Sequence, residues 1–292
     1  MSWFLVLMIF GYLPPVLLHT IGFILLYKAD SQLQNQKIVT MNLAVAEALH
    51  CLIKSIYNVL LRSGILPLCL CPSMFFSMFL NTATLLNIRL VYLHIIFDRF
   101  LDIWLNINYP IYINKKRLIM IIISIWGMSV CISGTLILLL YFKSIKHQTI
   151  LLAIYFPLDL FIIVIAVSTC LYLFAKVKGA KQQTHVKENI NSSRQRICLK
   201  MKIPSLMVLT FIIFNTSTTM VKYYLYFAKI RVVATHILIV IHILKICGYS
   251  SDAIIYVMLQ RRVRTLLASF LRKRKDRIQV EKAHINLANM SV

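Results

Sequence analysis

The sequence predicts an all-α fold: a bundle of seven transmembrane helices, with the N-terminus outside the cell and a short amphipathic helix after the seventh span. Hydrophobic residues make up 60% of the 292 residues and charged residues only 14%, whereas soluble domains carry about 25% charged residues. A membrane-spanning helix takes roughly 20 apolar residues, and seven continuous stretches reach that length, without the alternation of a transmembrane barrel. The predicted spans are 3–27, 38–61, 72–104, 118–141, 149–175, 203–228 and 232–259.

The seven apolar stretches differ in their flanking residues and in their length. The first span has no basic start and no small-residue cleavage site, so we expect it to be retained and not removed as a signal peptide. The second lies between Lys37 and Arg62, and the third is long enough to tilt or to project beyond the bilayer. The remaining four are separated by loops that contain Lys and Arg, and a stretch over 259–270 reads as an amphipathic helix lying on the membrane.

Lysine and arginine lie mainly on one side of this topology, and that side is expected to be the cytoplasm. The loops after the first, third and fifth spans, with the tail, carry Lys28, Lys37, Lys115, Lys116, Arg117, Lys176, Lys178, Lys181, Lys187, Arg194, Arg196, Lys200, Lys202 and the basic run 261–282. The opposite side carries Arg62, Lys143, Lys146, Lys229 and Arg231, with Lys222 near the boundary. The chain therefore divides into a transmembrane domain, 1–259, and a cytoplasmic helix and basic tail, 260–292.

The net charge of +23 is explained by the same asymmetry. Because the basic residues flank spans and do not form a soluble domain, we expect anionic inner-leaflet lipid as a partner and no nucleic acid. We find no Ser/His/Asp spacing, phosphate-binding loop or Cys/His cluster in the sequence, so we expect neither an enzyme nor a metal site.

A charged pair, Asp98 and Arg99, closes the third span. Charges at a lipid-buried helix end are costly and default to a functional reading. The pair begins an Asp-Arg-Phe triplet that is followed by a Tyr-Pro pair at 109–110 and a basic cluster at 115–117. This run resembles rhodopsin-like (class A) G-protein-coupled receptors, which carry an Asp-Arg-Tyr triplet, a Tyr-Pro pair and a basic cluster in the same order.

The resemblance extends through most spans. The matching residues are Asn42, Leu43 and Ala44 in the second span, Trp126 in the fourth, Pro157 in the fifth, Phe211 in the sixth, and Asp252 with Tyr256 in the seventh. Glu47, in the second span, stands where the family has Asp. The chain departs from the family in the sixth span, which lacks the Trp and the Pro, and at Ala253, where the family has Pro. The outer loop 142–148 contains no Cys for the family's outer disulfide.

The resemblance implies a multi-pass receptor of the plasma membrane that activates a heterotrimeric G protein. It assigns Asp98, Arg99, Phe100 and Tyr256 to the coupling and activation switch. An ion pair or hydrogen bond between Asp98 and Arg99 is expected to hold the arginine in the resting state.

Glu47 and Asp252 stand where the family binds a sodium ion, with Thr84 as the helper that the third span would supply. Two carboxylates close together in a medium of low dielectric do not both ionise easily, so one holds a proton or the pair binds a cation. We therefore expect a sodium ion or a shared proton at this site and no other cofactor. His19 replaces the family's Asn in the first span.

The seventh span carries a polar stripe. His242, Lys245, Tyr249, Asp252 and Tyr256 recur at steps of three and four residues, so they share one helical face. A polar face on a lipid-buried helix must turn toward the bundle interior. There it forms either purely structural polar contacts between helices, or a ligand pocket in the outer half with an activation switch in the inner half. We favour the pocket and switch.

The ligand pocket is expected to include His242, Lys245 and Tyr249, with Asn81 of the third span and Asn215 of the sixth. Asn81 stands where amine receptors have Asp, and an Asn forms no ion pair with an amine. The outer half of the predicted bundle and the outer loops contain Lys and Arg and no Asp or Glu. This positive charge favours an anionic or acyl ligand. Lys222 and Lys229 read more simply as side chains that reach the membrane interface.

Arg89 lies in the middle of the third span and needs a buried partner. We expect Asp159 of the fifth span to be that partner.

Two other functional classes stay open. One is a receptor-like chain that signals without a ligand, which the missing Trp, Pro and disulfide favour. The other is a proton-responsive transporter or channel, which the buried carboxylates favour and the lack of repeats and of Gly/Pro-broken helices disfavours.

Overall fold

The computed structural model describes residues 10–28, 34–62, 72–105, 109–143, 147–182, 205–228 and 235–259, with the single positions 6, 265, 268 and 269. These residues are almost entirely helical, and none of them forms a strand. The elements are α2 (Leu13–Lys28), α3 (Gln34–Arg62), α4 (Pro72–Leu105), α5 (Tyr109–Tyr112), α6 (Lys115–Lys143), α7 (His147–Gln182), η2 (Phe211–Thr216), α9 (Ser217–Phe227) and α10 (Thr235–Leu259). Residues 205–210 are helical and lead directly into the π-helix η2.

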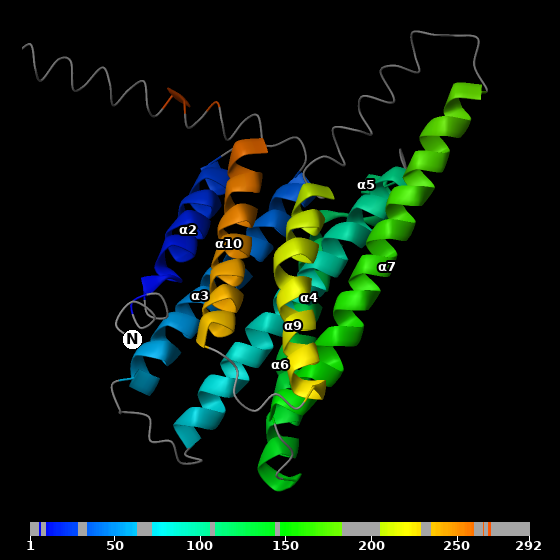
Figure 1. The fold of residues 1–292 in the computed structure, drawn as a ribbon. Helices are drawn as coiled ribbons and strands as arrows, with labels where there is room; N and C mark the ends of the chain where they lie inside the picture. Colours follow the sequence, from blue (N-terminus) through cyan, green and yellow to red (C-terminus); the bar gives the residue numbers. More distant parts are fainter. Residues whose placement is uncertain are drawn as a thin grey trace, which may run out of the picture.

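The contacts between neighbouring helices close into a ring, and Figure 1 shows the bundle from the side. Along the ring α2 contacts α3, α3 contacts α4, α4 contacts α7, α7 contacts α9, and α10 closes the circle between η2 and α2. α6 packs outside the ring against α4 and α3. The short helix α5 follows α4 at one end of the bundle, which we call the Arg99 end, and the opposite end, toward the end of α3, is called the Lys54 end.

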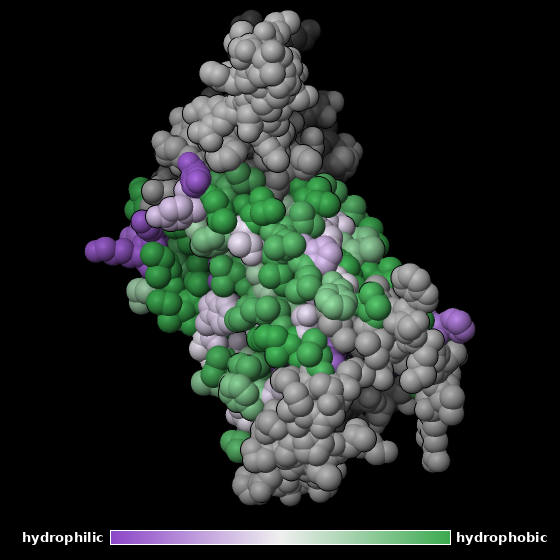
Figure 2. Space-filling model, turned by 90° about the vertical axis from the view of Figure 1, so that its left-hand side faces the viewer, coloured by the Kyte–Doolittle hydropathy of each residue, from purple (hydrophilic) through white to green (hydrophobic). Residues whose placement is uncertain are grey.

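The outside of the bundle is apolar. On α2 the side chains of Leu17, Ile21 and Ile24 are exposed, and Figure 2 shows a broad hydrophobic band on the side of the molecule where α2 lies. An exposed apolar surface of this size suits contact with lipid.

Five helical stretches are long and apolar enough to cross a membrane. They are Lys37–Val59, Phe75–Asp102, Lys115–Leu139, Ile154–Tyr172 and Ser205–Leu225, while Leu13–Lys28 is apolar but shorter. The chain is thus a multi-pass membrane protein by length and composition. The count of seven spans and the orientation stay predictions.

The helix boundaries follow the sequence expectation with two differences. α7 continues to Gln182, beyond the predicted end at 175, because residues 176–182 carry no helix-breaking proline. Residues 11 and 12 form a turn before α2, where the consecutive Pro14 and Pro15 cannot donate backbone hydrogen bonds. The predicted helix over 259–270 and the loop 183–204 lie outside the described residues, except for positions 265, 268 and 269, which are helical.

The sixth predicted span is not a uniform α-helix. Its centre, Phe211–Thr216, is a π-helix. A π-helical turn is a local irregularity that occurs mostly at functional sites. It gives this span an irregular centre without a proline, which the sequence pattern did not predict.

Gly248 lets α10 approach η2 closely. A Cβ atom built at Gly248 would lie 2.8 Å from the Cβ of Phe214. This separation is a steric clash, so a larger residue at this position would require α10 or η2 to move. Gly127, on α6, would meet nothing within 4 Å.

We expect Gly248→Val to push α10 away from η2 and to lower the thermal midpoint of the purified protein by several degrees, since overpacking costs about 1–3 kcal/mol. Gly127→Val is the matched control, because it places the same side chain in a helix facing open space. Equal midpoints for the two variants would contradict the close approach.

Candidate functional site

Arg99 is buried at the Arg99 end of α4 and lies between two acids of the same helix. Its Nη2 atom forms an ion pair with Asp98, and its Nη1 atom lies 3.5 Å from an oxygen of Asp102. All three side chains are buried. The predicted pairing of Asp98 with Arg99 is confirmed, and Asp102 is a second, longer contact that the motif did not specify.

Tyr109 of α5 completes this cluster. Its hydroxyl donates a hydrogen bond to the second carboxylate oxygen of Asp98, so Asp98 joins Arg99 to the segment that follows α4. Burial, followed by the charge of Asp98, raises the pKa of the Tyr109 phenol above its ordinary value, which keeps the hydroxyl protonated as a donor. In the sequence, Tyr109 is marked only as the first residue of the Tyr-Pro pair that follows the Asp-Arg-Phe triplet.

For the other two residues of the predicted switch, Phe100 and Tyr256, the described part of the structure shows no contact with Arg99. The ring of Phe100 stacks on Trp104 and packs against Tyr172 of α7. Tyr256 lies on α10, and its side chain is outside the described part of the structure.

A second buried cluster joins Glu47 of α3 to Asp252 of α10. The hydroxyl of Tyr92, on α4, contacts both carboxyl groups; it lies 3.3 Å from Glu47 Oε1 and closer to Asp252 Oδ2. Thr210 donates to the other oxygen of Asp252 at 2.6 Å. The two acids are fully buried, so the predicted carboxyl pair is confirmed as a contact.

His19 of α2 belongs to the same cluster. Its Nε2 atom lies 3.2 Å from Glu47 Oε2, and both side chains are fully buried. The first predicted span thereby supplies a titratable group to this cluster.

Thr84 is not part of this cluster, and its predicted place beside the carboxyl pair is wrong. Its hydroxyl lies 3.0 Å from Nδ1 of His50. Tyr92 takes the expected position; it lies eight residues, or about 12 Å of helix, from Thr84 along α4.

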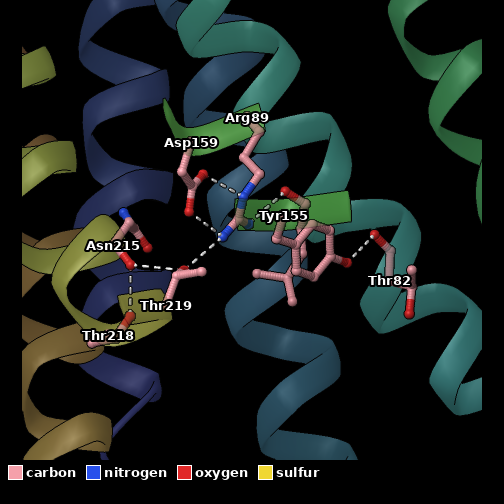
Figure 3. A network of polar contacts seen from close by, with 8 residues as sticks. Thr82, Arg89, Tyr155, Asp159, Asn215, Thr218 and Thr219 are labelled. Carbon is pink, nitrogen blue, oxygen red and sulfur yellow. Dashed lines mark hydrogen bonds and ion pairs between the residues drawn. The ribbon is translucent and has the colours of Figure 1, made fainter. Parts of the chain in front are cut away.

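A third cluster surrounds Arg89 (Figure 3). The guanidinium forms a two-pronged contact with Asp159 of α7, at 2.7 Å from Nε and 3.2 Å from Nη2. Nη2 also lies 3.3 Å from the hydroxyl of Thr219, on α9. The Tyr155 ring covers the guanidinium at 4.2 Å. The predicted pairing of Arg89 with Asp159 is confirmed.

Asn215 lies beside the Arg89 cluster. Its backbone carbonyl accepts hydrogen bonds from Thr218 and Thr219, and Figure 3 shows its side chain next to these threonines. Its side-chain Nδ2 is buried and finds no hydrogen-bond partner among the described residues.

The polar stripe of α10 faces the bundle interior as predicted. The Tyr12 hydroxyl forms a hydrogen bond with Nδ1 of His242, at 2.9 Å. The ring centroids of Tyr249 and His50 are 5.4 Å apart. The off-stripe residues Ile243 and Ile254 are exposed.

The remaining predicted pocket residues lie toward the Lys54 end. Lys245 of α10 is half-buried. Lys222 of α9 is exposed, and the expectation that it extends to the membrane interface stays a prediction. Asn81 is half-buried, and its Oδ1 atom has no hydrogen-bond partner in the described part of the chain.

A cavity of about 450 Å³ lies beside Arg99. Apart from Arg99, its lining is almost wholly apolar and comes from α4, α7 and residues 205–212. Sequence reasoning did not find this cavity, because its lining side chains come from segments far apart in the chain.

The described residues contain no group of three His, Cys, Asp or Glu side chains placed to hold a metal ion. The three clusters place buried ion pairs and hydrogen bonds within and between helices, which can be made and broken. Comparison with known proteins finds no family model and no curated protein that matches this chain.

Proposed function

We propose that this chain is a plasma-membrane receptor of the rhodopsin-like kind, which binds a small anionic or acyl ligand at the Lys54 end and activates a heterotrimeric G protein at the Arg99 end. The N-terminus and the Lys54 end face outward in this proposal, and the Arg99 end faces the cytoplasm and anionic inner-leaflet lipid. The observation that carries it is Arg99: a buried arginine, restrained by acids of its own helix, beside an apolar cavity.

The contacts of Arg99 with Asp98 and Asp102 would hold the guanidinium in place in the resting receptor, before a G protein binds. Charge-assisted hydrogen bonds are stronger than neutral ones, and Asp98 is itself fixed by Tyr109. A partner whose helix enters the cavity would compete for the guanidinium with its own carbonyl or carboxylate groups and bury apolar side chains against Val208 and Ile212.

The two ends are connected by a path of packed groups. The Tyr92 ring lies 4.5 Å from that of Phe211, the first residue of the π-helix. The Tyr92 hydroxyl reaches Asp252 on α10, and α10 meets η2 at Gly248. A ligand that displaces α10 would therefore move Tyr92 and η2, and with them the helical residues 205–210 that line the cavity.

We expect Asp98→Asn to raise ligand-free nucleotide exchange on the G protein. The amide cannot form the ion pair, and losing about 1.4 kcal/mol of restraint multiplies the ratio of active to resting receptor by about ten. GTP-analogue uptake by Gα subunits in membranes containing equal amounts of receptor measures the effect.

Asp102→Asn is the matched control, on the same helix and next to the same guanidinium. Its contact is longer, at 3.5 Å, so we expect a smaller increase. An increase from Asp102→Asn larger than that from Asp98→Asn would assign the restraint to the wrong acid.

A proton-responsive transporter is the second candidate, and the buried contact of His19 with Glu47 favours it. Such a protein would move protons or ions through the carboxyl cluster. Proton flux in liposomes reconstituted with the chain, abolished by Glu47→Gln, would support this function in place of the receptor.

A further inference from the structure

The cavity beside Arg99 reaches the outer surface of the bundle. It lies between α7 and the helical segment 205–212. Figure 1 shows α7 next to α9 toward the Lys54 end and leaning away from segment 205–212 at the Arg99 end. Val167 and Leu171 on one side and Leu209 on the other line the cavity and are exposed, in stretches apolar enough to cross a membrane. A molecule dissolved in the bilayer can therefore enter the cavity sideways.

The inner wall of the cavity is buried and carries one charged group. Ile96, Ala166 and Val208 are apolar and buried, and the buried Arg99 lines the same wall. The volume, about 450 Å³, lies within the roughly 300–1,000 Å³ of small-molecule sites. Along one side, segment 205–212 extends for about 10 Å of helix. This elongated apolar shape with one polar contact suits a ligand that has a hydrocarbon chain and a polar head.

The charges around Arg99 select the kind of polar head. Asp98 and Asp102 both contact the guanidinium, so two carboxyl groups already offset its single positive charge. A ligand carboxylate or phosphate would add a further negative charge to this cluster, and like charges repel. A cationic head would meet the guanidinium first, because no described residue that lines the cavity is an acid.

An uncharged acceptor fits the guanidinium better than either ion. Nη2 of Arg99 donates to Asp98, and Nη1 donates to Asp102. A guanidinium has five N–H donors, so these contacts with described residues use only two of them. The carbonyl oxygen of an amide or an ester can accept from a further N–H without changing the charge of the cluster.

We propose that this cavity binds an uncharged single-chain amphiphile, a fatty-acid amide or ester, with its chain between α7 and segment 205–212 and its carbonyl on Arg99. The ligand would enter from the leaflet on the Arg99 side. It would occupy the place that the proposed function gives to a helix of the G protein, and would therefore inhibit coupling. Only this inhibition rests on the proposed receptor function; the binding rests on the cavity alone.

Cys170 of α7 lines the cavity and reports its occupancy. Its side chain is exposed, as are Cys131 of α6 and Cys247 of α10, which lie outside the lining. The full-length protein in nanodiscs of saturated phosphatidylcholine is treated with an apolar maleimide, and peptide mass spectrometry follows the alkylation of each cysteine. Oleamide at ten times its apparent Kd should slow alkylation of Cys170 about tenfold, because only about one site in eleven stays free. Cys131 and Cys247 should react as before.

Probes with chains of the same length test the choice of head. We expect oleamide to protect Cys170 at a lower mole fraction than oleate, which is anionic, or oleylamine, which is cationic. Octadecene has no polar head and should not protect. Phosphatidylcholine is present in every sample, so protection above this background is not due to the bulk phospholipid.

Two substitutions on α7 separate the cavity from the general effect of a large lipid-facing side chain. Val167→Trp places a ring at the mouth of the cavity and should abolish the protection of Cys170 by oleamide. Val164→Trp is the matched control, since Val164 is exposed on the same helix but does not line the cavity, and it should retain the protection. Leu209→Trp, on the opposite side of the mouth, is a second blocking variant. Rates with and without oleamide are compared within each protein.

Four results would overturn the proposal: no slowing at Cys170, equal slowing at all three cysteines, stronger protection by oleate than by oleamide, or full protection in both blocking variants. Protection of Cys170 by oleamide without any G-protein activation by Asp98→Asn would leave this site standing and contradict the proposed receptor function. Activation by Asp98→Asn without protection of Cys170 would do the reverse.

Discussion

Replacing Arg89 by leucine is expected to reduce the yield of folded protein and to lower its thermal midpoint more than any other single change proposed for this chain. The guanidinium is the partner of Asp159, and the carboxylate would be left buried without a counter-charge. Breaking a buried ion pair from one side costs about 3–5 kcal/mol. The unfolding midpoint in detergent and the surface expression in cells measure the two effects.

The double variant Arg89→Leu with Asp159→Leu should recover part of the loss, because it removes both charges and replaces them with apolar groups. Arg117→Leu is the control for loss of a cation; Arg117 is exposed, and its guanidinium contacts the Tyr112 carbonyl. A double variant less stable than Arg89→Leu alone would show that Asp159 stabilises the bundle without Arg89, which contradicts a carboxylate stranded by the loss of its partner.

Glu47→Gln is expected to remove the response of ligand-free signalling to pH and to sodium. In the wild type the carboxyl groups of Glu47 and Asp252 meet through Tyr92. Two full charges about 4 Å apart repel by about 4 kcal/mol at an effective dielectric of 20, so the contact requires a shared proton or a bound cation. Loss of the proton as pH rises would separate α3 from α10, and ligand-free activation should therefore increase with pH.

Sodium should oppose that increase by taking the place of the proton between the two groups. Glutamine has the shape of a protonated glutamate and forms the same contacts at every pH, so its activity should be flat over the range in which the wild type responds. G-protein activation measured across pH, with sodium or a larger organic cation as the salt, gives the comparison. Equal insensitivity of both proteins would make the pair purely structural.

Much of the helical layout could be predicted from apolar run length, because the bilayer sets that length independently of the partners of each helix. The buried charges were also predictable. A lone Arg89 in an apolar span requires an acid, and few acids were available in the other spans. The polar stripe of α10 followed from helical periodicity alone.

The misplaced residues are those whose surroundings depend on helix packing. Thr84 and Tyr92 lie on the same helix, and only the relative heights of α3, α4 and α10 decide which of them meets the carboxyl pair. The π-helix at Phe211–Thr216 has no sequence marker comparable to a proline.

We propose that this chain activates a heterotrimeric G protein through Arg99. The most direct measurement is nucleotide exchange on a panel of purified Gα subunits, with Gβγ, by the protein reconstituted in lipid nanodiscs. Because the ligand is unidentified, the Asp98→Asn variant supplies the active state. We expect this variant to accelerate exchange on at least one Gα class, and Asp98→Asn combined with Arg99→Ala to return exchange to the receptor-free rate at the same thermal midpoint. Acceleration that persists without Arg99, or no acceleration on any Gα by folded Asp98→Asn protein, would contradict the account.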